Sequence, residues 1–446
     1  MRISDTIYLD YQASTPVDPR VMTAMEPFFR RDAGNPHSVD HAAGWAAQRA
    51  IDQSASAIAN FIGADPDEII FTSGATEANN LAILGLAERA PQDRRRLLVS
   101  AIEHKCVLES ASAASKRYGL KLEVIPAKES GLVDIDWLRT HLRDDVLCVA
   151  VMAVNNEIGT IQPLGEIGKL CDEVGAVFHC DAVQAPLTMR LNIHEFGIGT
   201  FSLSAHKIYG PKGIGAAFLR RDLQDRIAPL IFGGGQQRNL RSGTLPTPLC
   251  VGFGSAISIL QGSEWESERE RVKTLRDRFE RDLRRLGDFV RINVAGGERH
   301  PGNLNVQFAG YSAHDILLAV QPNLAASTGA ACTSGIPEPS HVLRAIGLSE
   351  SEAESSIRFS LGRFTDQADI EGAITLLRDA LSRVAAAASA EAAQANGMDD
   401  PYALSEPNFE GSLFDPKYME ELARKEGGQK PASAPPSSRP PDDHRA

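Results

Sequence analysis

The stretch AVFHCDAVQ, Ala176–Gln184, has the form of a short buried strand that ends in a carboxylate. Similar apolar runs recur between Ile69 and Leu219, with helix-like segments between them: IIFTSG, LLVSAIEH, LCVAVMAVN, FSLSAH and GIGAAFL. Short apolar strands that alternate with helices are typical of a mostly parallel sheet covered by helices on both faces. The sequence therefore predicts an α/β fold built on such a sheet.

Polar residues follow most of these predicted strands directly. They are Thr72, Ser73, His104, Asn155, Asn156, Asp181, Ser204, His206 and Lys207. In open α/β sheets, ligands bind beyond the carboxyl ends of the strands. We therefore expect these side chains to converge on one ligand site.

Composition and charge exclude several classes of protein. The 446 residues, 43% hydrophobic and 23% charged, are typical of a globular protein with a large core. The formal net charge of −12 argues against a surface that coats nucleic acid, so no direct nucleic-acid partner is expected. The longest apolar run, LCVAVMAV, is too short to cross a bilayer, and MRISDTIYLDYQ lacks the features of an export signal. No membrane partner is expected either.

Six cysteines are scattered along the chain without any C-x-x-C pair. This pattern predicts neither a disulfide framework nor a thiolate metal site, and it indicates the reducing cytoplasm as the compartment. His179 and Cys180 are neighbours on one strand, where their side chains face opposite sides, so we expect no metal site there.

Three segments are predicted along the chain. Residues 1–262 form a large domain around the sheet, although about the first 20 residues are candidates to pack on the second domain. Residues 263–395 form a smaller α+β domain, which a charged helix from about Glu264 to Leu286 opens and which contains the strands VRINV, GNLNVQF and SIRFSLG. Residues 396–446 hold eight of the 25 prolines and are expected to be a mostly disordered tail with one helical candidate, KYMEELARKE.

The stretch SGATEANN leads from a predicted strand into a predicted helix through Gly74 and Ala75, with Thr76 near the helix start. Unpaired amides and the helix dipole make such a turn a candidate phosphate site. An ordinary N-cap by Ser73 or Thr76, with Glu77 in the first turn, explains the same residues.

Asp181 and Lys207 follow two consecutive strands. A carboxylate at the end of a buried strand is costly without a cationic partner, which a protonated pyridine nitrogen would provide. A partly buried lysine of lowered pKa can form a Schiff base. A salt-bridged aspartate and a surface lysine are the alternatives for each residue alone. Pyridoxal phosphate (PLP) is the one ligand that uses the phosphate turn, Asp181 and Lys207 together.

Cys332 lies in AASTGAACTSG, among alanines, glycines and small hydroxyl residues. A buried cysteine that fills a tight turn is one explanation. The other is a reactive thiol, for which a loop poor in side chains supplies access and freedom of movement.

Seven motifs in order give the chain a resemblance to known proteins: SGATEANN, EHKCVLES, NNEIGTIQP, CDAVQ, SAHKIYGPKGIG, RSGTLPTP and STGAACTSGIPEPSHVLRAIGL. The sequence from YLDYQASTPVDPRV to SIRFSLGRFT resembles class V, fold-type I PLP enzymes, and more closely the cysteine desulfurases of the NifS/IscS group. The resemblance implies a large domain with a mostly parallel, seven-stranded type of sheet and a smaller α+β C-terminal domain.

The resemblance also implies a role for each matching residue. Lys207 would bind PLP covalently, and Asp181 would pair with the pyridine nitrogen. His104 would stack on the ring and move protons. Asn155 would contact the ring and the substrate, and Gln184 would lie near the phenolic oxygen.

Further residues would hold the phosphate and the substrate. The phosphate contacts would come from Ala75, Thr76, Ser204, His206 and Thr244. In the family that threonine reaches across a dimer interface, which implies a homodimer with shared sites. Arg358 would bind the substrate carboxylate through its two-pronged donor, with a structural salt bridge as the alternative.

The implied activity is the removal of sulfur from L-cysteine, which leaves L-alanine and a persulfide on Cys332. The sulfur would pass to a protein acceptor: an iron–sulfur scaffold, a tRNA thiolation relay or a DNA phosphorothioation system. A class V aminotransferase or a selenocysteine lyase would use the same PLP site without Cys332 as sulfur acceptor. A scaffold without catalysis is the third reading, which the intact Lys207, Asp181, His104 and Cys332 disfavour.

Overall fold

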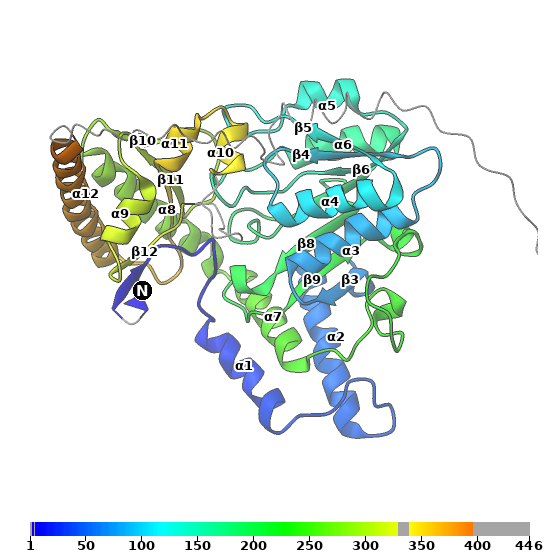
Figure 1. The fold of residues 1–446 in the computed structure, drawn as a ribbon. Coiled ribbons are helices and arrows are strands. Elements are labelled where there is room, and N and C mark those ends of the chain that lie inside the picture. Colours follow the sequence, from blue (N-terminus) through cyan, green and yellow to red (C-terminus); the bar gives the residue numbers. More distant parts are fainter. Residues whose placement is uncertain (1, 4, 329–338, 396–446) are drawn as a thin grey trace, which may run out of the picture. The chain divides into compact units, whose positions relative to one another are not determined.

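The computed structural model describes residues 2–3, 5–328 and 339–395 (Figure 1). Its central feature is a seven-stranded sheet with the order β3-β9-β8-β7-β6-β4-β5. The strands are β3 (Ile69–Thr72), β4 (Arg96–Ser100), β5 (Lys121–Ile125), β6 (Val146–Ala150), β7 (Val177–Asp181), β8 (Thr200–Ser204) and β9 (Gly215–Leu219). Neighbours from β5 to β8 are parallel, and β9 is antiparallel to both β3 and β8. The predicted mostly parallel sheet is confirmed.

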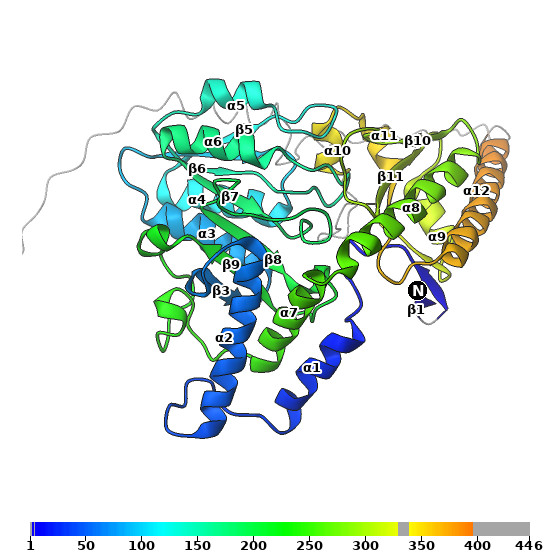
Figure 2. The same ribbon diagram turned by 180° about the vertical axis from the view of Figure 1, so that it is seen from behind.

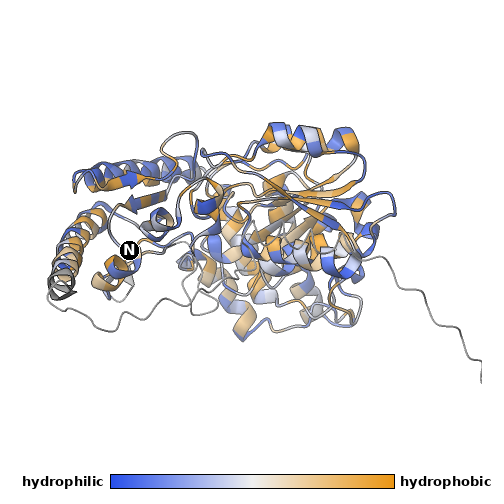
Figure 3. Cartoon of the chain, turned by 45° about the horizontal axis from the view of Figure 1, so that its top comes forward, coloured by the Kyte–Doolittle hydropathy of each residue, from blue (hydrophilic) through white to orange (hydrophobic). Residues whose placement is uncertain are grey.

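Helices cover both faces of this sheet because its strands are apolar on both sides. On β4, Leu98 packs into one core, whereas Leu97 and Val99 pack into the other. The first core contains residues of α2 (Ala42–Ile62), α5 (Ile135–His141), α6 (Leu164–Val174) and α7 (Thr247–Leu260). The second contains residues of α3 (Ala75–Glu88) and α4 (Lys105–Tyr118). Figure 3 shows the central strands mainly in the colours of hydrophobic residues.

A second, antiparallel sheet has the order β10-β11-β13. Its strands are β10 (Val290–Ile292), β11 (Asn303–Phe308) and β13 (Ser356–Ser360), and the helices that pack with it are α8 (Glu264–Arg284), α9 (Ala313–Ala319) and α12 (Gln367–Ala395). Figure 2 shows α8 and α12 side by side, and Arg278 of α8 donates to Glu371 of α12 at 2.7 Å. This layer has its own hydrophobic core.

The N-terminal residues belong to the core of the second sheet. The strands β1 (Arg2–Ile3), β2 (Thr6–Tyr8) and β12 (Leu324–Ala325) form a small sheet in which β2 is parallel to β12. Ile7 and Leu9 are buried in the second core. The chain then enters α1 (Pro19–Arg30), which packs on the first core through Val21 and Met25. Residues 10–18 therefore run from one core to the other.

Two short helices, α10 (His341–Ala345) and α11 (Glu350–Glu354), form a separate small core. Val342 and Leu343 of α10 pack there with Ile102 and Ile158, which lie in the loops after β4 and β6. The remaining helical elements are 3-10 turns, at Pro66–Glu68, Ala205–Lys207, Arg221–Arg226 and Gln237–Asn239. α10 and α11, which lead the chain into β13, are thereby packed against loops of the large sheet (Figure 1).

Strand β5 is the element of the large sheet that sequence analysis missed. Among the described strands it pairs only with β4, and in its sequence KLEVI only Ile125 is buried. An edge strand with charged and exposed residues lacks the apolar run by which the other strands were found. The predicted tail, 396–446, lies outside the described residues. Within the described part of the chain, no helix combines the length and apolar character of a membrane span.

Candidate active site

Lys207 closes the 3-10 turn that follows β8. Its Nζ donates to the backbone carbonyls of Gln12 at 2.6 Å and Ala13 at 2.7 Å. Burial lowers the pKa of Lys207 to about 8, and the positive charge of Arg358 acts in the same direction. A lysine with a lowered pKa presents more of the free amine at neutral pH, which is the form that attacks a carbonyl carbon.

Asp181 is the last residue of β7, and only 5% of it is exposed. Its Oδ2 accepts a hydrogen bond from Asn79 Nδ2 at 2.9 Å, and its Oδ1 accepts one from the Val183 amide at 3.1 Å. Two donors offset part of the cost of burying a carboxylate. The site therefore holds a fixed negative group that suits a cationic ring nitrogen.

Asn79 also links Asp181 to a buried histidine. Because an ionised carboxylate only accepts hydrogen bonds, the amide nitrogen of Asn79 faces Asp181 and its oxygen faces His179 Nε2, 3.0 Å away. Nε2 of His179 therefore carries the proton, and its Nδ1 accepts from Thr200 Oγ1 at 2.9 Å. Burial lowers the pKa of His179 to about 4, so the ring is neutral. This chain of hydrogen bonds fixes the orientation of Asp181.

His104 follows β4 and is the N-cap of α4. Its Nδ1 accepts from the Cys106 amide at 3.2 Å and lies 3.0 Å from Cys106 Sγ. A neutral His104 therefore carries its proton on Nε2. Desolvation lowers the pKa of His104, which Lys207 reinforces and Asp181 opposes. Burial raises the pKa of the Cys106 thiol to about 12, so this thiol stays protonated.

The N-terminus of α3 is open. Gly74 is the N-cap, so no side chain at that position accepts from the first amides of the helix. A Cβ placed on Gly74 would meet no atom within 4 Å, and Thr76 is exposed. Neither Ser73 nor Thr76 is the cap that the alternative reading expected. Free amides at a helix N-terminus beside open space suit a phosphate group.

Two further predicted phosphate residues, Ser204 and His206, lie at the end of β8 and in the turn after it. Ser204 ends this strand and is buried, with 4% exposed. His206 Nδ1 lies 3.2 Å from Ser14 Oγ, and burial together with Lys207 lowers the pKa of His206 to about 4. His206 is therefore neutral and acts through hydrogen bonds rather than charge.

Arg358 lies on β13 and is 4% exposed. Its Nη1 donates to the Asn156 carbonyl at 3.0 Å, and its Nη2 donates to Asp10 Oδ1 at 2.7 Å. Its buried Nε has no partner within the described part of the chain. The guanidinium therefore reaches the loop after β6 from the second sheet.

The side-chain amides of Asn155 and Gln184 bind backbone in this structure. Asn155 Nδ2 donates to the Ile102 carbonyl at 2.8 Å, and its Oδ1 accepts from the Glu157 and Ile158 amides. Gln184 Nε2 donates to the Gln12 carbonyl at 3.0 Å. These bonds hold the loop after β6 and the N-terminal segment in place, and the cofactor contacts of both residues stay predictions.

For two predicted site residues, Thr244 and Cys332, the described part of the structure gives no contact with the residues above. Thr244 is exposed, in the loop before α7, and its role across a dimer interface stays a prediction. Cys332 lies outside the described residues.

Sequence analysis missed the N-terminal contribution to the site. Asp10 binds Arg358, and the carbonyls of Gln12 and Ala13 bind Lys207. The acid inside the apolar motif YLDYQ was a signal for Asp10, because a charged residue there needs a partner. Backbone carbonyls carry no such signal in the sequence.

Two buried acids beside the site were also missed. Glu103 Oε1 accepts from the Met152 amide at 2.6 Å, and burial raises the pKa of Glu103 well above its ordinary value. Glu157 accepts from Ser340 Oγ, and burial raises its pKa as well. Glu103 precedes His104 directly, which was the available signal.

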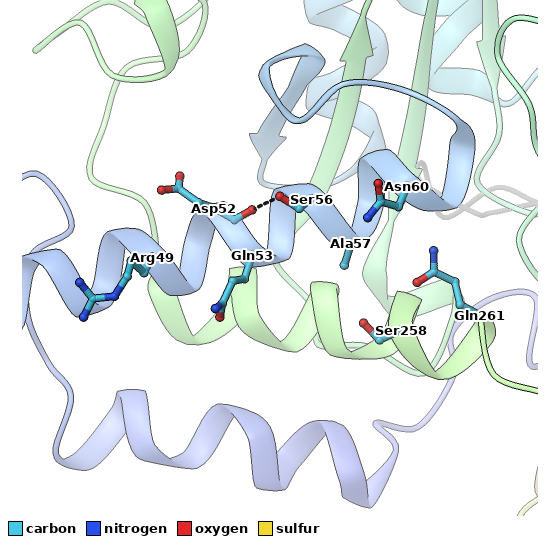
Figure 4. Close-up of a pocket in the computed structure, with 8 residues that line it drawn as sticks. All are labelled: Arg49, Asp52, Gln53, Ser56, Ala57, Asn60, Ser258 and Gln261. Atoms are coloured by element: carbon cyan, nitrogen blue, oxygen red, sulfur yellow. Dashed lines mark hydrogen bonds between the residues drawn. The ribbon is translucent and has the colours of Figure 1, made fainter.

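A polar groove between α2 and α7 lies apart from these residues (Figure 4). It is lined by Arg49, Asp52, Gln53, Ser56, Ala57, Asn60, Ser258 and Gln261. Ser56 Oγ donates there to the Asp52 carbonyl at 2.8 Å. None of the predicted site residues lines this groove.

The residues present fit PLP. The open N-terminus of α3 suits its phosphate, the fixed carboxylate of Asp181 suits its pyridine nitrogen, and the lowered pKa of Lys207 suits its aldehyde. The carboxylate and the lysine come from the ends of β7 and β8, which are neighbouring strands.

The chain is similar to known proteins over most of its length. Residues 7–372 match the family Aminotransferase class-V. Cysteine desulfurase IscS of Rickettsia typhi is 48% identical over 371 residues, 83% of this chain and 90% of that protein.

Two solved structures are similar in fold. A NifS-like protein has a TM-score of 0.79 and 31% identity, over 86% of this chain and 100% of that one. SspA in complex with cysteine has a TM-score of 0.71 and 36% identity, over 80% of this chain and 99% of that one.

Proposed function

The chain belongs to the aminotransferase class-V family, and we propose that it is a PLP-dependent cysteine desulfurase that converts L-cysteine to L-alanine. The observation that carries this proposal is the presence of two residues at the same edge of the sheet. One is Lys207, whose pKa is lowered, and the other is the buried Asp181, which accepts two hydrogen bonds. The 48% identity to a cysteine desulfurase supports the same activity.

PLP, when bound, supplies an electron sink for the pair of electrons released at the substrate α-carbon. Lys207 would hold it covalently, and Asp181 would hold its ring nitrogen protonated. The amides of Ala75 and Thr76, with the side chains of Thr76, Ser204 and His206, would hold its phosphate. The open helix N-terminus and the strand ends described above support these assignments.

The substrate would be oriented by Arg358 and Asn155, and its protons moved by His104 and Lys207. Arg358 has a buried Nε without a partner among the described residues, and a carboxylate would satisfy it. His104 carries its proton on Nε2 when neutral, and desolvation lowers its pKa, so the ring rests in the neutral form and readily gives up a proton that it takes from the substrate. Gln184 would contact the phenolic oxygen of the ring.

Cys332 would take the sulfur. Its thiolate attacks the substrate sulfur, so that a sulfur–sulfur bond forms while the bond from that sulfur to Cβ breaks. The electron pair of the broken bond stays with the three-carbon fragment, which takes up a proton and leaves as alanine. The products are one persulfide and one alanine for each cysteine, without an external oxidant or reductant.

The same proposal includes a sulfur acceptor, a homodimer and a cellular compartment. The persulfide sulfur would pass to a protein acceptor such as an iron–sulfur scaffold or a thiolation protein. Two chains would form a homodimer in which Thr244 serves the partner's site. Function in the cytoplasm is supported by five free cysteines in the described part of the chain, Cys106, Cys148, Cys171, Cys180 and Cys250.

The test is to incubate the purified, PLP-loaded protein with L-cysteine and to measure alanine, sulfide and pyruvate. Alanine is the expected result, with an equal amount of sulfur on Cys332 or, when dithiothreitol is added as the reductant, released as sulfide. An aminotransferase would instead remove the amino group and leave 3-mercaptopyruvate, in which the sulfur is still attached, whereas pyruvate with sulfide would indicate β-elimination. Alanine from selenocysteine but none from cysteine would indicate a selenocysteine lyase, and no product from either would indicate a scaffold.

A further inference from the structure

Ser340 and His341, at the start of α10, each bind a loop that follows a strand of the large sheet. Ser340, the N-cap of α10, is 5% exposed, and its Oγ donates to Glu157 Oε2 in a short hydrogen bond. His341 Nε2 lies 2.9 Å from the Glu103 carbonyl. Since a carbonyl only accepts, this ring nitrogen carries a proton and donates. Two consecutive side chains therefore bind two different loops.

Those two loops carry predicted site residues. Glu103 directly precedes His104 in the loop after β4. Glu157 lies in the loop after β6, where its amide donates to Asn155 Oδ1 at 2.8 Å and its carbonyl accepts from Asn303 Nδ2 at 2.9 Å. The backbone of Glu157 is thus held by Asn155 and Asn303, independently of the bond between its side chain and Ser340.

Apolar packing reinforces both hydrogen bonds. Val342 and Leu343 of α10 are buried in one small core with Ile102 and Ile158. Each of these isoleucines is a direct sequence neighbour of one of the two acids. The start of α10 is therefore a rigid attachment rather than a single contact.

The sequence shows what this attachment is next to. Ser340 and His341 come eight and nine residues after Cys332. On the other side, Ser327 comes five residues before Cys332 and pairs with Arg358: the Ser327 amide donates to the Arg358 carbonyl at 3.2 Å, and the Arg358 amide donates to the Ser327 carbonyl at 2.7 Å. Both described flanks of the Cys332 segment are thus bound to residues of the site.

We propose that Ser340 and His341 are positioning residues for the sulfur-transfer step, which hold the C-terminal flank of the Cys332 segment on the loops of His104 and Asn155. This inference rests on the proposed desulfurase function. A tethered nucleophile reacts fast only when its anchor leaves it within reach of the substrate atom. Neither residue needs to touch cofactor or substrate for this role.

The test separates cysteine binding from sulfur transfer in the PLP-loaded enzyme. Stopped-flow absorbance measures the spectral change when cysteine binds at the PLP site, and rapid quench measures the first turnover of alanine and of persulfide on Cys332. Ser340→Ala should slow the alanine burst by about ten- to a hundred-fold while the first spectral change keeps the rate of the parent. Ser340→Thr, which keeps the hydroxyl, should restore the burst.

Ser349→Ala is the matched control. Ser349 is the N-cap of α11, accepts from the Glu352 amide at 3.3 Å and donates to Glu352 Oε2 at 2.7 Å. Ser340 makes the same pair of bonds, with the Leu343 amide at 3.2 Å and with Glu157. Both substitutions therefore remove an N-cap and a serine–glutamate bond, and only Ser340 flanks Cys332. Ser349→Ala should leave the alanine burst within about two-fold of the parent.

His341→Ala is the second variant and should give the same selective loss, so that the inference does not depend on the stability of Ser340→Ala alone. A burst as fast as the parent's in both variants would overturn the inference. So would an equal slowing of both steps, because that is the signature of general damage to the site. A parent enzyme that forms no alanine from cysteine would contradict both the proposed function and this inference. An active parent with unaffected variants would contradict this inference alone.

Discussion

Arg358 and Asp10 form an ion pair over 2.7 Å, with 5% and 19% of their side chains exposed. They are 348 positions apart, and they join β13 to the N-terminal segment beside Lys207. Asp10 presents a carboxylate to the guanidinium that we assign to the carboxylate of the substrate. The pair holds the planar donor of Arg358 in place, and its buried Nε has no partner among the described residues.

Arg358→Lys should weaken the binding of L-cysteine by about ten- to a hundred-fold, since a lysine keeps the charge and loses the two-pronged donor. The measurement is the concentration dependence of the spectral change of the PLP enzyme on titration. Cysteamine, which has the same amine and thiol but no carboxylate, is the control ligand and should bind parent and variant equally. A parallel loss for both ligands would show that Arg358 shapes the site without binding the carboxylate.

Lys207→Ala should remove the visible absorption of lysine-bound PLP, because Lys207 is the lysine of the turn directly after β8 and burial lowers its pKa to about 8. PLP should still bind through the phosphate contacts and dissociate on dialysis faster than from the parent. Lys212→Ala is the control, since Lys212 lies in the same motif, is exposed and has no role in the proposal. Retention of the lysine-bound absorption in Lys207→Ala would move the covalent attachment to another residue.

Cys332→Ser should keep the PLP absorption and the first spectral change with cysteine, yet form no appreciable persulfide or alanine. A serine hydroxyl is a far poorer nucleophile toward sulfur than a thiolate at neutral pH. Mass spectrometry of the cysteine-treated protein locates the persulfide.

The other five cysteines supply the controls for this substitution. Alanine replacements at Cys106, Cys148, Cys171, Cys180 and Cys250 should cost mainly stability, about 1 kcal/mol for a typical point mutation. Burial raises the pKa of each of these thiols, which keeps them protonated. A persulfide mapped to one of them would contradict the assignment of Cys332.

Thr244 and Lys207 should serve one site from two chains. Mixing a Lys207→Ala chain with a Thr244→Ala chain should give heterodimers in which one site carries both lesions and the other carries neither. Alanine formation by the purified heterodimer should then exceed that of both single variants and approach half of the parent activity. Heterodimers that form, as shown by differential tags, but gain no activity would mean that each site is built from one chain.

Glu103→Gln should gain stability relative to the parent as the pH rises. The pKa of the buried Glu103 carboxyl lies well above 4.5 in the folded protein, so folding favours the protonated form. The stability from this group is fully present below the unfolded pKa and is lost as the pH rises toward the folded pKa. The difference in thermal midpoint between variant and parent should therefore be small at pH 4 and grow up to pH 8.

Glu352→Gln is the control of opposite sign for that experiment. Hydrogen bonds from Ser349 lower the pKa of the exposed Glu352 carboxyl, so its contribution is present above the unfolded pKa. The variant should lose stability relative to the parent over the same range. A Glu103→Gln variant whose difference stayed flat with pH would show that Glu103 is ionised in the folded enzyme.

The sequence predicted six of the seven central strands, because a strand buried on both faces is an apolar run whatever surrounds it. It missed β5, whose edge position leaves Val124 51% exposed. It also predicted Asp181, Lys207 and His104 as site residues, since a charged or titratable residue at the end of an apolar strand requires a partner, and the family resemblance added Arg358. The structure places these residues on the strands and turns where they were expected.

Sequence alone thus determined which chemistry this protein carries, because the identity and order of strand-end residues are local properties of the chain. Only the tertiary structure decided what holds them. The carbonyls of Gln12 and Ala13 bind Lys207 from 195 and 194 positions away, and Glu157 binds Ser340 from 183 positions away. Backbone carbonyls look alike at every position, and a buried acid does not name its partner, so these contacts exist only once two hydrophobic cores have brought the distant segments together.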